Sequence, residues 1–329
     1  MLLLVLLIAG LSSCGVKARI KRADKKFAIG EYYEAADIYK STYSRVNSKS
    51  ERALKARIAF NMGECYRALN NPRAAQSYQN AIRYKYQDSI VYLRSAQVLQ
   101  QQAKYKDAEK GYLIYLEAHP DCYAAKAGAY ACRQVSDWKK ESTRYRVAPA
   151  KDFNAKRSAN FAPAFIGQEG DAVMFTSNRS TSSGKGNKKK LKRPSPVTGA
   201  QNFTLFQTRK NAAGQWEEIE PAEGLASEEK DEEDSQKNDS TGAQKAGSAE
   251  IGVCCFTADG KTMYFTYSCP INGQDQGAKI YVSNRASGEW GEPQEVKIFN
   301  DSSITVGHPS INMTADTLYF VSDAPGGFG

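Results

Sequence analysis

The chain has 329 residues, which exceeds one typical domain and predicts two. Its composition, 41% hydrophobic and 25% charged, is ordinary for a globular protein. The net charge of +9 is concentrated in basic stretches at 17–26 and 185–193, partly offset by an acidic stretch at 228–234. Because no nucleic-acid-binding module surrounds the basic stretches, we expect no nucleic-acid partner.

The N-terminus carries the most specific motif of the sequence. Residues 2–9 are continuously apolar, which suits the core of a signal peptide and is too short to span a bilayer. Residues 11–15, Leu-Ser-Ser-Cys-Gly, resemble the lipobox of bacterial lipoproteins, in which a peptidase cuts before the cysteine and its thiol carries the lipid. We therefore predict a signal peptide over 1–13 and lipidation at Cys14. The alternative is an ordinary buried cysteine after a hydrophobic helix.

Six further cysteines are predicted to be structural. They are Cys65, Cys122, Cys132, Cys254, Cys255 and Cys269. No two of them form a Cys-x-x-Cys pair, and the histidines of the chain are His119 and His308. Because a metal or redox centre needs several such residues at suitable spacing, we expect no metal site and no cofactor.

A repeated pattern between residues 30 and 120 predicts pairs of helices. An alanine is followed four positions later by a tyrosine, three times, and the alanines are 39 and then 34 residues apart. The alanine lets two helices approach closely, and the tyrosine one turn further on fills the groove between them. The residues expected to pack between the helices are Ala35, Tyr39, Gly63, Tyr66, Ala74, Tyr78, Ala108 and Tyr112.

This pattern resembles the tetratricopeptide repeat, which has a period of 34 residues and stacks helix pairs into a solenoid. The resemblance implies a helical domain over 14–148 that binds peptides or protein surfaces on its concave face. We expect a further, capping helix over 121–135. The first helix, over 17–29, is the least regular of the pattern because it is strongly basic.

Short alternating strands replace the helical pattern in the second half of the chain. Residues 251–265 align without a gap with 306–320, and each copy is a strand, a tight turn and a second strand. A later Gly-x-Trp motif supplies Trp216 and Trp290. These features resemble the blades of TolB-type and WD-like propellers. We therefore predict an incomplete β-propeller of about two and a half blades over 149–329, in which Trp216 and Trp290 pack between blades.

Two polar segments interrupt the strand pattern, and the patterns at both ends of the chain are incomplete. Residues 180–201 are rich in Ser, Gly and Lys, and 226–248 in Glu, Asp, Ser and Gly, so we expect both to be disordered loops. The third blade stops after its second strand, and no basic residue precedes the apolar run before Cys14. We therefore expect a longer natural protein at both ends, unless a partner covers the open blade.

The order of these parts resembles one family. The lipobox, helices and blades occur with the segments Asn-Phe-Ala-Pro at 160–163, Phe-Thr-Ser-Asn-Arg at 175–179, Gly-His-Pro at 307–309 and Ser-Asp-Ala-Pro-Gly-Gly at 322–327. This combination resembles the PorE-like, OmpA-family envelope lipoproteins of Bacteroidetes, which are associated with type IX secretion. In that family, a carboxypeptidase-regulatory-like domain and a peptidoglycan-binding OmpA-like domain follow the propeller.

The resemblance implies a location and partners. It implies a lipid-anchored outer-membrane protein on the periplasmic face, because the residues after Cys14 lack the acidic cluster that resembles a surface-export signal. The implied partners are envelope or secretion-machinery proteins. Peptidoglycan would be bound only through a C-terminal domain that this sequence does not contain.

Catalytic motifs are not recognisable in the sequence. There is no Gly-x-Ser-x-Gly elbow and no Gly-rich phosphate loop, while His119 falls at a helix end and His308 at the start of a strand. We therefore predict a non-catalytic scaffold. The alternatives are the propeller half of a periplasmic hydrolase or peptidase, and a glycan-binding lipoprotein that uses exposed Trp and Tyr side chains.

Overall fold

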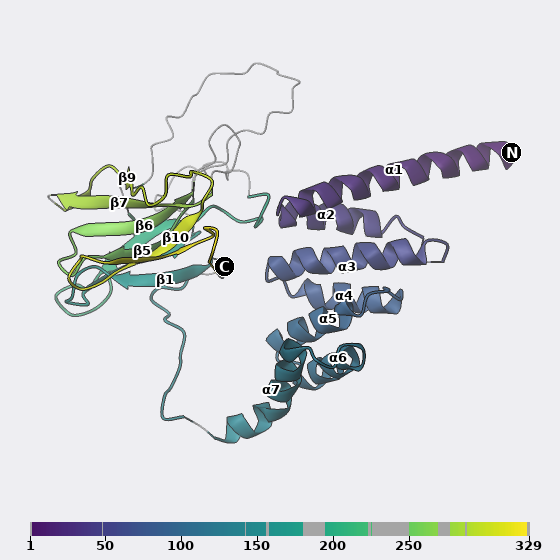
Figure 1. Ribbon diagram of the computed structural model, residues 1–329, viewed down its shortest axis with the longest axis horizontal. Helices are drawn as coiled ribbons and strands as arrows, with labels where there is room; N and C mark the ends of the chain where they lie inside the picture. Colours follow the sequence, from purple (N-terminus) through teal and green to yellow (C-terminus); the bar gives the residue numbers. More distant parts are fainter. Residues whose placement is uncertain are drawn as a thin grey trace, which may run out of the picture. The chain divides into compact units, whose positions relative to one another are not determined.

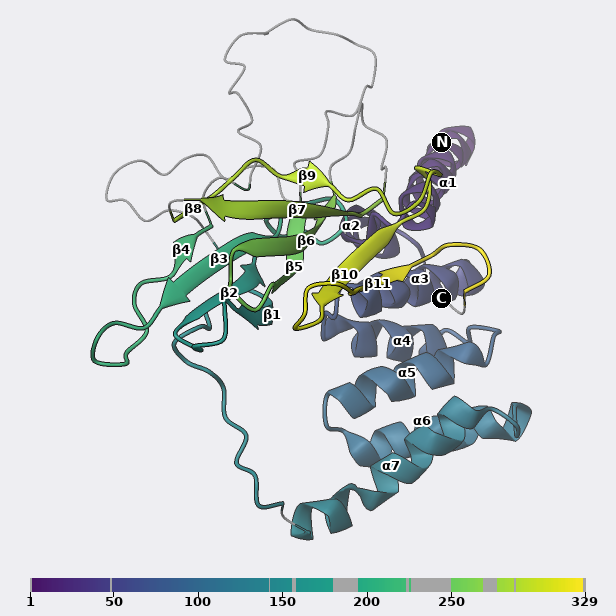
Figure 2. The same ribbon diagram turned by 60° about the vertical axis from the view of Figure 1, so that its left-hand side comes forward.

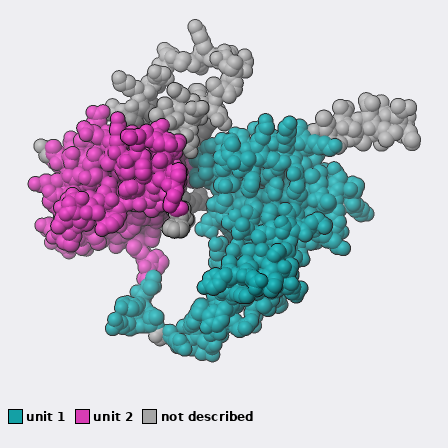
Figure 3. All heavy atoms as spheres, in the orientation of Figure 1, with its two compact units in different colours: residues 1–147, 195–199 teal, residues 148–194, 200–329 magenta. Residues whose placement is uncertain are grey.

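The computed structural model describes residues 2–47, 49–141, 143–155, 158–179, 195–222, 225, 250–268, 277–286 and 288–327, with side chains from Gly15 onward. The chain divides into two units (Figure 3). Unit 1 comprises residues 1–147 and 195–199, and unit 2 comprises 148–194 and 200–329. Unit 1 is helical and unit 2 consists of antiparallel sheets, which confirms the predicted order of helices followed by sheets.

Unit 1 is a stack of helices in which each helix packs against the next along the chain (Figures 1 and 2). The described helices are α1 (Leu2–Ala28), α2 (Tyr32–Tyr43), α3 (Arg52–Ala68), α4 (Arg73–Arg83), α5 (Ile90–Gln101), α6 (Tyr105–Ala118) and α7 (Tyr123–Lys140). Among the helices in the described part of the chain, none is both long enough and apolar enough to cross a membrane.

Small side chains bring these helices together. Ala35, Ala74 and Ala108 are each at most 1% exposed and belong to one continuous core that runs through the stack. The basic segment over 17–29 is helical as far as Ala28, because Ile20 on its inner face is buried in the same core. The expected capping helix over 121–135 is α7.

The described residues of unit 2 form three antiparallel sheets. The first sheet is formed by β1 (Asn160–Phe165), β2 (Ala172–Ser177), β3 (Thr204–Arg209) and β4 (Glu220–Pro221). The second is formed by β5 (Glu250–Phe256), β6 (Thr262–Ser268), β7 (Lys279–Ala286), β8 (Glu289–Trp290) and β9 (Gln294–Glu295). The third is formed by β10 (Val306–Ile311) and β11 (Leu318–Ser322). Strands that follow one another within a sheet are paired, except that β9 pairs with β7 and not with β8, so the sheets are meanders.

The first strand of each sheet carries the same irregularity. The pairing register shifts within β1, β5 and β10, which marks a β-bulge in each of these strands. At the bulge, Ala162, Val253 and His308 have φ values of 50°, 38° and 54°, in the left-handed region that residues other than glycine rarely adopt. Because the same strained conformation occurs at equivalent positions in three strands, it is a regular feature of these sheets.

The two predicted loops are only partly within the described residues. Residues 226–248 and 180–194 lie outside them. Residues 195–199 are described and pack within unit 1, where the carbonyl groups of Pro196 and Val197 accept hydrogen bonds over 3.2 Å from the backbone N–H groups of Glu34 and Tyr33. These carbonyls satisfy two N–H groups in the first turn of α2, whose N-cap residue makes no side-chain cap.

Candidate functional site

Each helix pair of unit 1 contains one buried tyrosine with a paired hydroxyl group. Tyr39, Tyr78 and Tyr112 are at most 2% exposed. Each hydroxyl donates a 2.6 Å hydrogen bond to the preceding helix, and the acceptors are Asp24 Oδ1 in α1, Glu64 Oε1 in α3 and Gln100 Oε1 in α5, respectively. Burial, reinforced for Tyr39 and Tyr78 by the neighbouring carboxylates, raises the pKa of these tyrosines, that of Tyr112 to about 12.

The residues predicted from the repeat lie around these tyrosines. A methyl group at Gly63 would come within 2.7 Å of Tyr78 Cε1, so the helices α3 and α4 approach too closely there for any side chain. Gly128 in α7 lies under the Tyr112 ring in the same way, which the sequence pattern missed. Tyr66 is 7% exposed and belongs to the same core.

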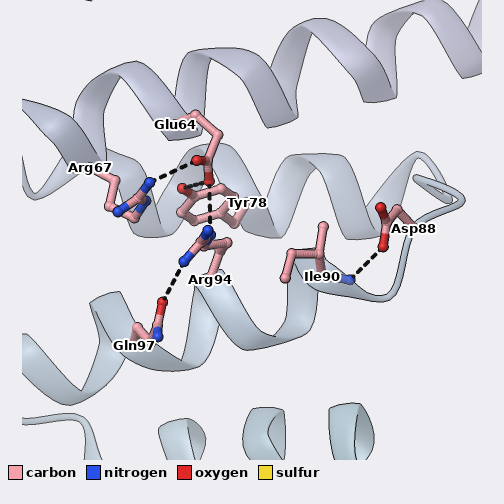
Figure 4. Close-up of polar contacts among 7 residues, drawn as sticks. All are labelled: Glu64, Arg67, Tyr78, Asp88, Ile90, Arg94 and Gln97. Atoms are coloured by element: carbon pink, nitrogen blue, oxygen red, sulfur yellow. Dashed lines mark hydrogen bonds and ion pairs between the residues drawn. The ribbon is translucent and has the colours of Figure 1, made fainter. Parts of the chain in front are cut away.

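Glu64 is the centre of a cluster that joins three helices (Figure 4). Its carboxylate accepts hydrogen bonds from the Tyr78 hydroxyl at 2.6 Å and from Arg67 Nη2 at 2.8 Å. Arg94 Nε of α5 lies 3.5 Å from the same carboxylate, and Arg94 Nη1 donates to Gln97 Oε1 over 3.3 Å. The hydrogen bond from Arg67 to Glu64 raises the pKa of this arginine.

The charges in this cluster do not balance. One carboxylate faces two guanidinium groups, which leaves an excess positive charge. The Nε atoms of Arg67 and Arg94 are buried and make no hydrogen bond among the described residues, although Arg94 Nε forms an ion pair with Glu64 over 3.5 Å. The two side chains as a whole are 35% and 30% exposed, so a ligand can reach them. Two partly exposed guanidinium groups with an excess positive charge suit a carboxylate ligand, because guanidinium groups bind carboxylates through charge-assisted hydrogen bonds.

A second cluster continues the polar surface toward α1. Asp24 accepts from Tyr39 and lies 3.4 Å from Arg57 Nη2, while Asn61 Nδ2 donates to the Tyr39 hydroxyl over 3.2 Å. Arg57, Asn61 and Glu64 are spaced four and three residues apart and therefore share one face of α3. We call the linked residues the polar row: Asp24, Arg57, Asn61, Glu64, Arg67, Arg94, Gln97 and Gln100.

None of the polar row was predicted from the sequence. The signal that was available is a polar residue 12 to 15 positions before each repeat tyrosine, at Asp24, Glu64 and Gln100. Because this spacing varies from pair to pair, it does not register as a repeat in the way that the alanines and tyrosines do.

The two predicted tryptophans lie in unit 2. Trp290 is 6% exposed, belongs to a core shared by the first two sheets, and has its ring 5.7 Å from that of Phe256 in its own sheet. Trp216 has its ring 5.0 Å from Phe153, in the segment that precedes the first sheet. Arg285 lies over the Trp290 ring at 5.6 Å. Both indoles therefore pack as structural residues within unit 2.

Successive sheets of unit 2 are joined by a repeated hydrogen bond. The backbone N–H of Val253, at the bulge of β5, donates to Thr176 Oγ1 of β2 over 3.0 Å. The N–H of His308, at the bulge of β10, donates to Thr266 Oγ1 of β6 over 2.9 Å. In the third sheet, Val321 occupies the equivalent place, opposite Gly307, and has no hydroxyl group. The bulges in β5 and β10 thus supply the backbone N–H groups that join the second and third sheets to the sheet before them.

The remaining residues singled out in the sequence have structural surroundings. Cys65, Cys122, Cys132, Cys254 and Cys255 are free thiols, and Cys269 and the side chain of Cys14 lie outside the described residues. No metal-binding group of His, Cys, Asp or Glu occurs among the side chains that the structure describes. His119 ends α6, where it stacks on Tyr115 with the ring centres 4.4 Å apart, and His308 is exposed on β10.

Comparisons with known proteins identify helical repeat domains as similar. No family model and no curated protein matches the chain. The type III secretion chaperone SycD of Yersinia enterocolitica, in complex with a peptide of the translocator YopD, is 15% identical over 37% of this chain and 95% of its own, with a TM-score of 0.32. The Sgt2 TPR domain of Aspergillus fumigatus is 18% identical over 41% of this chain and 88% of its own, with a TM-score of 0.33. The first TPR domain of Spaghetti (RPAP3), bound to an HSP90 peptide, is 20% identical over 37% and 93%, with a TM-score of 0.32.

Proposed function

We propose that this chain is a non-catalytic scaffold of the bacterial envelope whose helical unit binds a protein partner through the polar row. The observation that carries the proposal is the Glu64 cluster, in which two partly exposed arginines share one carboxylate and leave an excess positive charge. An acidic side chain or a terminal carboxylate of a partner would balance this charge by accepting hydrogen bonds from the exposed parts of the guanidinium groups.

A photo-cross-linking experiment tests this proposal. A benzophenone amino acid is placed at position 97, in the polar row, and at position 110, an exposed position on α6 outside it. We expect a defined protein adduct from position 97 in envelope preparations of the source bacterium, and its loss when Arg94→Gln is added. Equal adducts from both positions, or an adduct from position 97 that survives Arg94→Gln, would contradict the proposal.

The membrane anchor is the second part of the proposal. It is supported by the lipobox-like segment at 11–15 and the apolar run before it. Cells fed an alkyne fatty acid should label the wild-type protein and leave the Cys14→Ser variant unlabelled, and the variant should move from the membrane to the soluble fraction. Equal labelling of both proteins would place the lipid on another residue. Absence of label from both would exclude lipidation.

We further propose that the three sheets are successive blades of a β-propeller and that the protein serves type IX secretion or peptidoglycan-linked envelope assembly. The meander sheets and the repeated threonine hydrogen bond between them support the first part. The combined motifs of a PorE-like, OmpA-family lipoprotein support the second. Deletion of the gene in the source bacterium should reduce secretion of type IX cargo, and normal secretion together with a normal envelope would count against this role.

A further inference from the structure

The last helix of unit 1 has an apolar face on each side. Ala125, Gly128, Ala129 and Cys132 are the buried residues of α7. On the opposite side, Tyr123, Tyr130 and Trp138 are 83%, 59% and 51% exposed. Their spacing of seven and eight residues places them along one side of the helix. We call this face the α7 stripe: Tyr123, Ala127, Tyr130, Ala131, Gln134 and Trp138.

The position of α7 in the stack explains why this face is open. The inner helices α3 and α5 each pack between the preceding and the following helix, whereas α7 packs against α6 and, less closely, α5. No described helix covers its other side. Three large aromatic side chains exposed along one helix form the kind of apolar surface that marks a protein interaction site.

The composition of the α7 stripe indicates that a helix occupies it. Inside unit 1, helices meet where an aromatic ring lies on a small residue: Tyr78 on Gly63 between α3 and α4, and Tyr112 on Gly128 between α6 and α7. The α7 stripe combines the same ingredients, since Ala127 lies between Tyr123 and Tyr130. A further helix with a small residue opposite Tyr130 would therefore continue the existing stack.

The charges on α7 indicate which kind of helix can occupy the α7 stripe. The helix carries four basic side chains, Lys126, Arg133, Lys139 and Lys140, and one acidic one, Asp137, which gives a net charge of +3. Glu109 of α6 pairs with Arg133 at 2.9 Å, and Asp137 pairs with Lys140 at 3.1 Å. Because two copies of this face would bring like charges together, a second copy of the chain is a poor occupant and an acidic helix is a good one.

We propose that the α7 stripe is a second docking site of this protein and that its occupant is an acidic amphipathic α-helix of a partner protein. This rests on the proposed scaffold function but uses other residues than the polar row. The apolar side of the partner helix would cover Tyr130 and Trp138, and its carboxylates on one side would face Lys126 and Arg133, which are seven residues apart along one edge of the stripe.

Two synthetic helical peptides test the proposal. Both carry the same alanine and leucine face, and they differ only in having glutamate or lysine at the flanking positions. Each is labelled with a fluorophore and titrated with the full chain in its unlipidated Cys14→Ser form, with fluorescence anisotropy as the readout. We expect the glutamate peptide to bind and the lysine peptide to bind at least about tenfold more weakly.

Variants of the chain assign the binding to this face. Tyr130→Lys should weaken the glutamate peptide by about tenfold or more, as for the loss of a central interface aromatic. Tyr145→Lys, which changes a tyrosine that is 70% exposed outside the helix, is the matched control and should leave binding unchanged. Arg94→Gln should also leave it unchanged, so that failure of the polar-row proposal and failure of this one are distinguishable.

Three outcomes would overturn the proposal. They are equal binding of the two peptides, unchanged binding by a Tyr130→Lys variant whose circular dichroism spectrum is native, and absence of binding by either peptide. Light scattering on the Cys14→Ser chain provides a separate check, because a concentration-dependent dimer that Tyr130→Lys abolishes would assign the face to a second copy instead.

Discussion

The helical unit and the sheet unit both repeat a hydroxyl hydrogen bond, but they use it at different levels of the repeat. In unit 1, the Tyr78 hydroxyl donates to Glu64 inside one helix pair, and neighbouring pairs meet through apolar packing and through side chains of the polar row. In unit 2, the Thr176 hydroxyl accepts from the backbone of Val253 and joins one sheet to the next. The polar contact therefore fixes the geometry within a repeat in the first case and between repeats in the second.

This difference has consequences for specificity. A hydrogen bond buried inside a helix pair contributes stability only while both helices are packed, and its acceptors, Asp24, Glu64 and Gln100, are members of the polar row. A hydrogen bond between sheets sets the distance and orientation of neighbouring sheets, because a bulged backbone N–H has one fixed direction. The hydroxyl hydrogen bonds of unit 1 therefore act within helix pairs, and those of unit 2 set the position of one sheet relative to the next.

The largest predicted effect is the loss of stability of the helical unit at high pH. Burial gives Tyr39, Tyr78 and Tyr112 a higher pKa in the folded state than the value of about 10 for an exposed tyrosine. The folded chain therefore holds these protons more tightly than the unfolded chain, so the stabilisation is complete below pH 10 and is lost as the pH rises toward 12. We expect the helical circular dichroism signal to fall in this range together with a cooperative rise in tyrosinate absorbance. Ionisation of all tyrosines with an unchanged helical signal would contradict this.

The second largest effect is expected from truncating one of these tyrosines. Tyr78→Ala should lower the free energy of unfolding of unit 1 by about 3–5 kcal/mol, because it removes a fully buried ring and leaves a cavity. Tyr78→Phe keeps the ring and removes only the hydrogen bond to the Glu64 carboxylate, so it should cost about 1.5–3 kcal/mol. Chemical denaturation followed by helical circular dichroism measures both. Equal losses for the two variants would mean that ring packing contributes nothing beyond the hydroxyl group.

The sequence predicted what repeats locally and missed what depends on distant partners. The alanine and tyrosine of each pair are four residues apart on one helix, so their periodicity is visible in the chain. Glu64 in α3 forms an ion pair with Arg94 in α5, and no pattern in the sequence predicts this contact. Thr176 accepts from a residue 77 positions away through a backbone N–H that only the bulge at Val253 makes available. Such contacts arise from tertiary structure and leave no pattern in one sequence.

A smaller effect is expected at the helix contact under Tyr78. Gly63→Ala places a methyl group 2.7 Å from a ring carbon of a fully buried side chain, so the helices must separate, at a cost of about 1–3 kcal/mol. Gly15→Ala in α1 is the matched control, because nothing lies within 4 Å of the added methyl group. It should be neutral or stabilise the helix by up to about 1 kcal/mol. Both are measured in the Cys14→Ser chain, and a neutral Gly63→Ala would show that α3 and α4 have room to move.

Effects of similar or smaller size are expected between the sheets of unit 2. Thr176→Val keeps the shape of the side chain but leaves the Val253 N–H without its acceptor, which should cost about 1–3 kcal/mol because Thr176 is fully buried. Thr266→Val should cost less, because water can reach the more exposed bond at His308. The matching serine variants retain the hydroxyl group and should recover part of the loss.

These threonine variants also test whether the hydrogen bond acts between repeats. If it does, Thr176→Val should loosen the packing of the second sheet on the first while the helical signal of unit 1 stays unchanged. Hydrogen exchange of the Val253 amide is the direct measurement, and it should become faster in Thr176→Val but not in Thr266→Val. An amide that exchanges equally slowly in both variants would show that packing alone protects the bulge. The hydroxyl hydrogen bond of unit 2 would then not act between its sheets, and the two units would not differ in this respect.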